Sequence, residues 1–477
     1  MPIPSLAFML VFLPTCLILY FLFFFYRPAQ NVILLLASLV FYAFGQTVYV
    51  LALLLSMAWN YAMGLAIATR QKKGHSSKAL TGIAVGMNVL LLLAFQWINQ
   101  MLAFLPSWFG CVAPSFQVLM PLGLAWYTLQ AVGYCLDVYR GEVTAEKNPL
   151  YVGLHLAFFP KITLGPLVDY GMMRRQFTER QHTIDKFSRG LCRFVVGLAK
   201  KLLLADQLSY LVNYIFTQAA MDNTVVQLPV SLAWLGLFAF GLQLYYELSA
   251  FADMAIGLGE MFGFDLPENF CYPFVATNMT DFWRRWNITP LAWFRKYVFG
   301  FLPRTENQDL VIRNLLITWI VFALFVGGFE WTFVFWGVWN FLLLLAEHFF
   351  GYAERISGRF LKHVYTLLAV LLGFVLLRSP SLYTAGQYFA SMLGLNNNGF
   401  WSTLLPVFLR ENWMPLGLGV VFAIPLAPKW NALAQRPGKG KSLWRLSAIL
   451  YPVFIAGLLI VCMVFIVQNK AVITPVY

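Results

Sequence analysis

The chain has 477 residues, of which 60% are hydrophobic and only 11% are charged. A soluble domain carries about 25% charged residues, so this composition excludes a water-soluble fold and predicts an integral membrane protein. The net charge of +13 does not indicate nucleic-acid binding, because the basic residues form short clusters between apolar runs. The six cysteines are scattered without a C-x-x-C pair, which favours neither a disulfide framework nor a metal site.

Apolar runs long enough to cross a bilayer recur along the chain, because a hydrocarbon core of about 30 Å requires roughly 20 helical residues. The first run, from Ser5 to Tyr26, lacks a basic leader and a cleavage site, so we predict a retained first helix. We therefore predict an all-α, polytopic membrane protein. The expected spans lie near 5–26, 30–46, 48–68, 79–104, 117–139, 190–216, 229–248, 312–329, 331–350, 364–378, 414–428 and 446–467.

Two segments between these spans have features that a spanning helix does not tolerate. Residues 150–170 contain an FFP motif beginning at Phe158 and a GP pair beginning at Gly165, which interrupt a helix twice. We predict a re-entrant element there. Residues 262–304 mix tryptophans with many charged side chains, so we predict helices that do not span but lie at the membrane interface or beside a cavity.

The distribution of basic residues predicts an orientation. Lys and Arg cluster within 70–78, 174–189 and 436–445, whereas the loop around Cys111 has no basic residue. Basic loops remain on the cytoplasmic side, so the N-terminus and the Cys111 loop are expected outside.

An ordered series of short motifs in the middle of the chain resembles the membrane-bound O-acyltransferase family. DMAIGLG begins at Asp253, FGF at Phe262, PENF at Pro267 and DFWRRW at Asp281. Further blocks that resemble the family are LLLASLVFYA from Leu34, YTLQ from Tyr127, DVYRG from Asp137, the FFP and GP pair above, GLAKK from Gly197 and WTFVFWG from Trp331. The resemblance covers essentially the whole chain and is nearest to the bacterial branch that includes the alginate O-acetylation membrane subunit.

The resemblance implies a single transmembrane domain over 1–477, with its core signature at 241–340. It implies a ring of about 11–12 membrane helices, with re-entrant and interfacial helices around a central cavity where a cytoplasmic acyl donor meets an acceptor from the other side. The implied donor is an acyl-CoA or acyl-carrier-protein thioester, with no tightly bound cofactor and no metal. The implied location is the bacterial inner (cytoplasmic) membrane. The implied partners are the lipid bilayer and an extracytoplasmic acyltransferase or polymer-export protein, and not nucleic acid.

Catalysis in this family depends on two polar positions, both of which usually carry histidine. The first follows DFWRRW and is Asn287 here, a residue that many members of the family carry. Alignment backwards from Trp331 puts the second, nearly invariant position at Gly327, which can neither accept a proton nor orient a hydroxyl. A missing general base typically costs about 10²–10⁴ in rate.

Two side chains are alternatives for the missing base. Glu330 is three residues from Gly327 and is expected on the same helical face, although it could equally mark the end of the span. His155 precedes the FFP break and is the one histidine of five expected to point towards a cavity, although a histidine on an apolar helix is more often structural.

Other polar residues of the signature are expected to line a substrate cavity. In addition, Arg284 or Arg285 is expected to pair with the carboxylates of Glu247 and Asp253, because a carboxylate in an apolar span is costly without a partner. The expected cavity residues are Asp253, Asp281, Arg284, Arg285 and Trp286.

Three functions remain open at this stage. The first is an acyltransferase with a rebuilt site, which passes an acyl group, expected to be acetyl, from a cytoplasmic donor to an extracytoplasmic polysaccharide or partner protein. The second is a catalytically silent homologue that scaffolds or regulates a complex modifying a cell-surface polymer. The third is a transporter or channel, which has the least support because the sequence contains no internal repeat.

Overall fold

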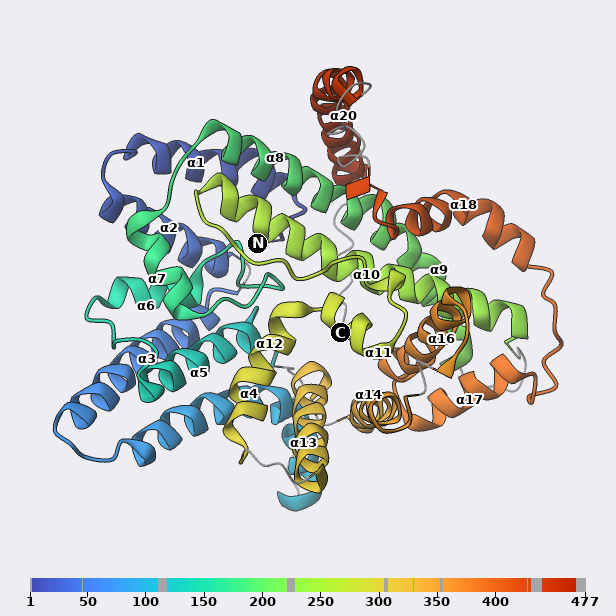
Figure 1. The fold of residues 1–477 in the computed structure, drawn as a ribbon, viewed down its shortest axis with the longest axis horizontal. Coiled ribbons are helices and arrows are strands. Elements are labelled where there is room, and N and C mark those ends of the chain that lie inside the picture. The colour runs from blue at the N-terminus through green and yellow to red at the C-terminus, as the bar shows by residue number, and fades with distance from the viewer. Residues whose placement is uncertain are drawn as a thin grey trace. The chain divides into compact units, whose positions relative to one another are not determined.

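The computed structural model describes residues 2–44, 46–109, 118–220, 228–303, 308–328, 330–351, 355–426, 428–429 and 440–468. Within these residues the regular elements are helices and no strand occurs, so the predicted all-α fold is confirmed (Figure 1). The loop around Cys111, Arg304 and the basic residues Arg436 and Lys439 lie outside the described residues.

The chain forms two compact units, of which the first comprises Met1–Phe194 with Met254–Pro267 and the second comprises Val195–Asp253 with Glu268–Tyr477. The single domain implied by the family resemblance stays a prediction. Helices of the first unit are η1 (a π-helix, Ala7–Phe12), α1 (Leu13–Leu22), α2 (Arg27–Ala43), α3 (Tyr49–Lys72), α4 (Lys78–Phe109), α5 (Leu124–Arg140), α6 (Pro149–Ala157), α7 (Tyr170–Glu179) and most of α8 (Ile184–Ala199). The last residues of α10 (Val230–Met261) also belong to it.

The second unit contains the remaining helices and most of α10. They are η2 (a π-helix, Lys200–Ala205), α9 (Asp206–Ala220), η3 (Pro273–Val275), α11 (Met279–Arg285), α12 (Ile288–Tyr297), η4 (Phe299–Phe301), α13 (Gln308–Gly327), α14 (Trp331–Phe350), α16 (Arg359–Arg378), α17 (Leu382–Leu393), α18 (Leu405–Phe422) and α20 (Gly440–Gln468).

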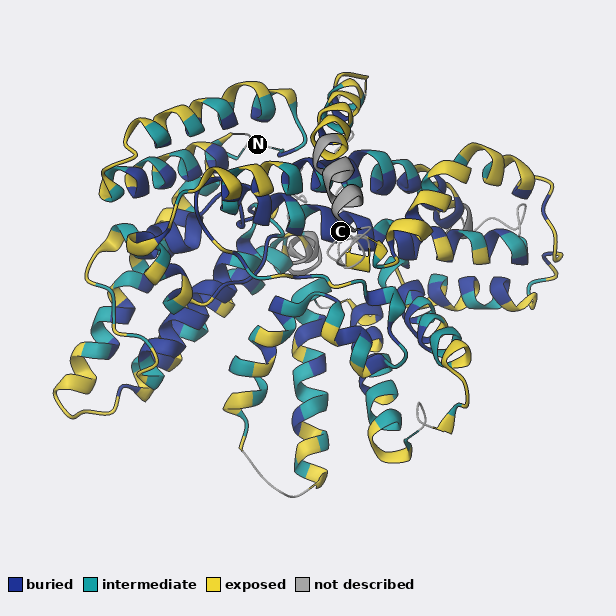
Figure 2. Cartoon of the chain, turned by 45° about the horizontal axis from the view of Figure 1, so that its top comes forward, coloured by how far each residue is buried: buried dark blue, intermediate teal, exposed yellow. Residues whose placement is uncertain are grey.

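Seven described helices are long and apolar enough to cross a membrane. They are α3, residues Lys78–Asn99 of α4, α10, α13, α14, α16 and residues Leu450–Gln468 of α20. The protein itself buries 78% of the apolar part of α10 but only 17–33% of that of the other six, so most residues of these six helices are intermediate or exposed (Figure 2). The remaining predicted spans are shorter or interrupted, and the 190–216 run is divided by the π-helix η2.

The polar segment 262–304 contains only short helices. The longest two, α11 and α12, have 7 and 10 residues, which at 1.5 Å per residue is roughly half a bilayer or less. The prediction that this segment does not span as a helix is therefore confirmed.

The 150–170 segment breaks where its FFP motif predicts. Helix α6 ends at Ala157, and the chain turns until α7 begins at Tyr170. The turn is buried and anchored, because the Phe159 amide donates to the Ser38 hydroxyl at 3.0 Å and the Trp126 indole donates to the Gly165 carbonyl at 2.7 Å. Irregular backbone covered by protein in this way is compatible with a re-entrant element.

Candidate acyl-transfer site

Helix α11, which carries most of the DFWRRW motif, is fixed at its N-terminus by two polar side chains. Asn278 accepts a hydrogen bond from the Asp281 amide at 2.6 Å. The Glu347 carboxylate of α14 accepts from the Met279 amide at 2.6 Å and the Thr280 amide at 3.1 Å. A negative charge at a helix N-terminus satisfies its unbonded N–H groups and favours its dipole. Glu347 therefore positions the motif from a distant part of the sequence.

Asn287 lies at the junction between α11 and α12 in a left-handed conformation, with φ at 50°. Asn269 holds it there: its side chain donates to the Asn287 Oδ1 at 2.9 Å, and its carbonyl accepts from the Ile288 amide at 2.9 Å. The Asn269 Oδ1 also accepts from the Thr289 amide at 3.0 Å. Because the Asn287 oxygen is occupied, the orientation of the side chain is fixed, and its Nδ2 has no partner among the described residues. The side chain is a positioned hydrogen-bond donor.

The other DFWRRW residues have different environments. Trp286 is buried in an aromatic cluster, with its ring 5.3 Å from that of Phe270 and 5.4 Å from that of Phe282 between centroids. Arg285 forms an i,i+4 ion pair with Asp281 at 2.9 Å, and Arg284 is exposed. Their role as cavity residues stays a prediction.

Gly327 is the last residue of α13, and the ring of Phe333 packs directly on its Cα. A Cβ at this position would overlap that ring. The aromatic ring of Phe333 therefore occupies the place where a side chain at 327 would begin, and glycine is required there by packing. Sequence reasoning missed this contact because Phe333 follows in a different helix.

The expectation that Glu330 shares a helical face with Gly327 is wrong. Helix α13 ends at Gly327, Gly328 adopts a left-handed φ of 67°, and α14 begins only at Trp331. Glu330 is the exposed N-cap residue of α14 and makes no side-chain capping hydrogen bond. The catalytic role of Glu330 stays a prediction. Its support is the exposure of the carboxylate and no longer its spacing from Gly327.

The carboxylates of α10 pair with lysines and not with the arginines that we expected. Lys201 contacts the two Glu247 oxygens at 2.6 and 2.7 Å and Asp206 at 2.7 Å. Lys200 contacts Asp253 at 2.6 Å. The expected pairing with Arg284 or Arg285 is therefore wrong, because the lysines of the GLAKK block, which begin η2, already neutralise these carboxylates. The sequence signal that indicates these partners is the pair Lys200 and Lys201, which lies within an otherwise apolar run.

His155 is buried in the first unit, on α6. Its ring lies edge-on to Tyr170 with centroids 5.2 Å apart, and neither ring nitrogen makes a hydrogen bond of normal geometry to a described residue. Nearby, the buried Lys161 amine donates to the Gln130 side-chain oxygen. Sequence reasoning did not place Lys161 and Gln130 beside His155, and these two residues make His155 part of a buried polar group and not a lone core histidine.

Comparison with known proteins identifies the family. Probable alginate O-acetylase AlgI of Pseudomonas aeruginosa is 33% identical over 439 residues, which cover 90% of this chain and 81% of the relative. The sequence model of the MBOAT, membrane-bound O-acyltransferase family matches residues 147–363. The chain belongs to the membrane-bound O-acyltransferase family. More distant similarities are to a peptidoglycan O-acetyltransferase of Helicobacter pylori, 28% identical over 395 residues (76% of this chain, 73% of the relative), and a teichoic acid D-alanyltransferase of Bacillus subtilis, 23% identical over 313 residues (63% and 76%).

In this membrane-bound O-acyltransferase family protein, the matched region contains every residue assigned to catalysis from the sequence: His155, Asn287 and Glu330, together with Gly327. The predicted family is confirmed, and so is the prediction of an integral membrane protein. Among the described residues, no three His, Cys, Asp or Glu side chains gather closely enough to hold a metal ion. The catalytic assignments stay predictions.

Proposed function

We propose that this protein transfers an acyl group from a thioester donor, an acyl-CoA or acyl-carrier protein, to a hydroxyl of an extracytoplasmic polysaccharide or partner protein. The names of the alginate and peptidoglycan relatives support an acetyl group and a polysaccharide acceptor. The observation that carries the proposal is the Asn287 carboxamide, whose oxygen is held by Asn269 while its nitrogen remains available to donate.

In this reaction the Asn287 side-chain nitrogen is proposed to donate a hydrogen bond to the oxyanion that forms from the thioester carbonyl. The acceptor hydroxyl oxygen attacks the thioester carbonyl, a C–O bond forms, the C–S bond breaks, and the hydroxyl proton ends on the departing sulfur. A fixed donor aimed at the carbonyl oxygen stabilises the negative charge that develops there. Proton transfer requires an intermediate acceptor, and the two side chains proposed for it are the exposed Glu330 carboxylate and the His155 imidazole.

The test is turnover by the full chain reconstituted in lipid vesicles. We expect Asn287→Gly, which tolerates the left-handed backbone, to lower kcat by about 10²–10³ with little change in KM, as for other lost oxyanion donors. Asn287→Asp keeps the oxygen that accepts from Asn269 and controls for the local fold. Full activity in the folded Asn287→Gly variant would refute this role.

The same assay separates the two proposed proton acceptors. Glu330→Gln removes the carboxylate at an exposed position, and His155→Phe keeps the edge-on contact with Tyr170 while removing the nitrogens. We expect one of the two to lose about 10²–10⁴ in kcat. Retention of full turnover by both variants would place the base elsewhere.

The packing at Gly327 favours a second candidate, a catalytically silent scaffold or regulator of a cell-surface polymer modification complex. The family resemblance assigns the usual histidine to position 327, and the Phe333 ring fills the place where a side chain would begin there. Gly327→His alone is therefore expected to destabilise the fold by about 1–3 kcal/mol and to restore no activity. Under this alternative the native protein shows no turnover, the Asn287→Gly variant still complements polymer acylation in cells, and an extracytoplasmic acyltransferase or polymer-export protein copurifies with it.

We also propose residence in the bacterial inner membrane with the N-terminus outside, as the basic clusters predict. Ser76 is exposed between α3 and α4 and suits labelling. A Ser76→Cys variant should react with an impermeant thiol reagent only after the cells are opened. Reaction in intact cells would reverse the orientation.

A further inference from the structure

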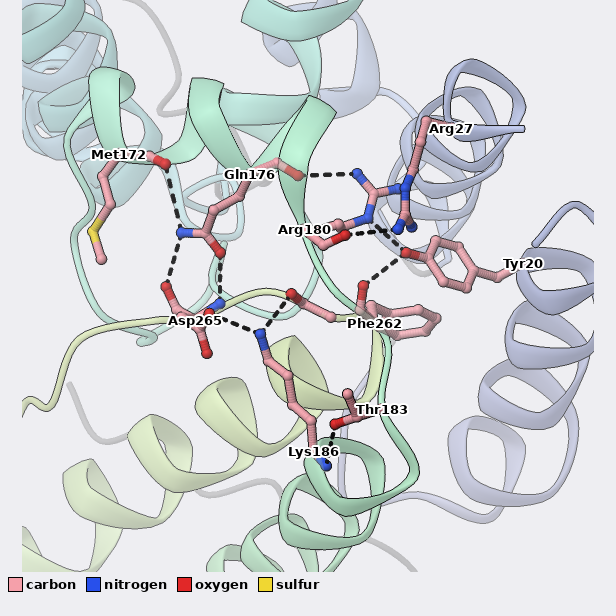
Figure 3. A network of polar contacts seen from close by, with 10 residues as sticks. Tyr20, Arg27, Met172, Gln176, Arg180, Thr183, Lys186, Phe262 and Asp265 are labelled. Carbon is pink, nitrogen blue, oxygen red and sulfur yellow. Dashed lines mark hydrogen bonds and ion pairs between the residues drawn. The ribbon is translucent and has the colours of Figure 1, made fainter. Parts of the chain in front are cut away.

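In the first unit, the end of α1, the start of α2 and the segment between α7 and α8 meet at a polar cluster that neither the family nor the proposed reaction assigns (Figure 3). Arg180 lies at its centre and is only 4% exposed. Its Nε donates to the Tyr20 hydroxyl at 2.7 Å and its Nη1 to the Asn31 side-chain oxygen at 2.7 Å. A buried guanidinium is thus held by neutral oxygens.

Arg27 lies beside Arg180 and is only partly buried. It donates through Nη1 to the Gln30 side chain at 2.9 Å and to His182, and through Nη2 to the Arg180 carbonyl at 2.6 Å. A guanidinium has five N–H donors, so two of those on Arg27 have no partner among the described residues. We refer to Tyr20, Arg27, Arg180 and His182 as the arginine corner.

The arginine corner carries positive charge without a matching carboxylate. No described acidic side chain forms an ion pair with Arg27 or Arg180, although Glu179 and Asp185 are exposed on the same segment. The neighbouring Lys186 is neutralised by Asp265 at 2.7 Å.

The protonation of His182 reflects this surplus of positive charge. Burial together with Arg27, Arg180 and Lys186 lowers the pKa of His182 to about 4, so this imidazole is neutral at pH 7 and can accept from Arg27. Two guanidinium charges remain for an anion from outside.

An apolar ledge adjoins this charge in the sequence. Residues 23–26 read Phe-Phe-Phe-Tyr and precede Arg27 directly, and the Phe25 side chain is 96% exposed. Ile184, two residues after His182, is 87% exposed. Exposed aromatic side chains next to arginine are typical of segments at the boundary between acyl chains and headgroups.

We propose that the arginine corner binds the phosphate headgroup of an anionic phospholipid. Arg27 supplies the two unused donors, Arg180 supplies a second fixed charge, and the 23–26 ledge contacts the acyl chains of the same leaflet. A soluble phosphate compound has no acyl chain to contact the apolar residues 23–26, whereas a phospholipid has both a phosphate and acyl chains. A lipid is therefore the proposed occupant. The predicted orientation puts the corner at the cytoplasmic leaflet, where anionic lipids concentrate and basic pockets bind their headgroups.

The experiment measures lipid selectivity of the full chain by native mass spectrometry and by thermal stability in detergent. Short-chain phosphatidylglycerol is compared with short-chain phosphatidylcholine and with inorganic phosphate. We expect phosphatidylglycerol to bind and to raise Tm, and the other two to do neither. Arg27→Gln should lower the preference for phosphatidylglycerol about fivefold, as expected for one arginine at a membrane surface. The matched control is Arg175→Gln, an exposed arginine of the same basic segment.

Three results would overturn the proposal. They are equal loss in Arg27→Gln and Arg175→Gln, equal stabilisation by inorganic phosphate or coenzyme A, and no preference for phosphatidylglycerol in the unmodified protein. Should Arg27→Gln fail to fold, Phe25→Ser tests the ledge at a solvent-exposed position, and undiminished affinity for phosphatidylglycerol in that variant would also contradict a lipid occupant. None of these measurements depends on turnover.

Discussion

Two buried clusters, one in each unit of this protein, hold positive charge in different ways. In the second unit, Lys201 is enclosed by the carboxylates of Glu247 and Asp206. In the first unit, Arg180 of the arginine corner is held by neutral oxygens from tyrosine, asparagine and glutamine side chains, whereas the nearby Lys186 is paired with Asp265. Both arrangements satisfy hydrogen bonds, but only the first satisfies charge.

This difference indicates which polar clusters are structural. A buried ion pair whose charges balance does not attract a further counter-ion. Removing one partner leaves the other charge buried without compensation. A cation held by dipoles keeps its field, so an anion that reaches it gains energy. Charge balance therefore assigns a structural role to Lys201 and favours ligand binding at the arginine corner.

The largest predicted effect is at the closed cluster. Lys201→Met leaves the Glu247 and Asp206 carboxylates without their lysine, and we expect a loss of about 3–5 kcal/mol in the free energy of unfolding. Lys200→Met, which breaks the more exposed pair with Asp253, is the control and should cost about 1–2 kcal/mol. Thermal unfolding in detergent measures both, and equal losses would contradict the ranking.

A smaller effect is expected where the partners are neutral. Arg180→Met leaves the Tyr20 hydroxyl and the Asn31 oxygen without a donor, at about 1–3 kcal/mol, but strands no opposite charge. The exposed Arg175→Met should change the free energy of unfolding by less than about 0.5 kcal/mol. A loss in Arg180→Met greater than that in Lys201→Met would contradict the comparison between the two clusters.

The smallest effect concerns pH. The pKa of His182 is about 4 in the folded protein and near 6.5 in the unfolded chain, so the unfolded chain binds more protons between these values. Stability is therefore full above about 6.5 and falls as pH decreases. Because His182 is half-exposed and screened, we expect a loss of about 1 kcal/mol or less between pH 7 and pH 5.5.

His182→Asn should flatten this dependence, and bound phosphatidylglycerol should reduce it, because an anion favours the protonated imidazole. The Glu146 carboxylate does not interfere in this range. Burial alone would raise its pKa, but hydrogen bonds from the Asn148 amide, Arg174 and Tyr170 lower it below 4.5. Its stabilising contribution is therefore lost only at lower pH. An unchanged pH slope in His182→Asn would show that another group titrates.

The helix breaks were predictable because proline and glycine act locally. The FFP motif ends α6 at Ala157, and the charge density of 262–304 correctly excluded a spanning helix there. The order of the motifs predicted the family, because each motif is a run of neighbouring residues. The prediction that Glu330 shares a helical face with Gly327 is wrong for a local reason. Helix α13 ends at Gly327, and Gly328 adopts a left-handed backbone conformation.

Contacts between segments that are distant in the sequence could not be predicted. The residues around Glu247 in the sequence do not predict that Lys201 is its partner. The residues around α11 do not predict that the Glu347 carboxylate accepts hydrogen bonds from the first amides of this helix. An all-helical membrane protein of the O-acyltransferase family is predictable from the amino-acid sequence alone, because composition, breaks and motif order are properties of neighbouring residues. The assignment of Asn287 and Gly327 to the two family positions stays a prediction from the resemblance. Three features follow from tertiary contacts alone: Phe333 fills the place beside Gly327, the Asn287 nitrogen has no acceptor among the described residues, and Arg27 and Arg180 share one corner in which no described carboxylate pairs with them. These depend on which helices meet, and the free energy of those contacts comes from burial and charge pairing across the chain and not from local preference.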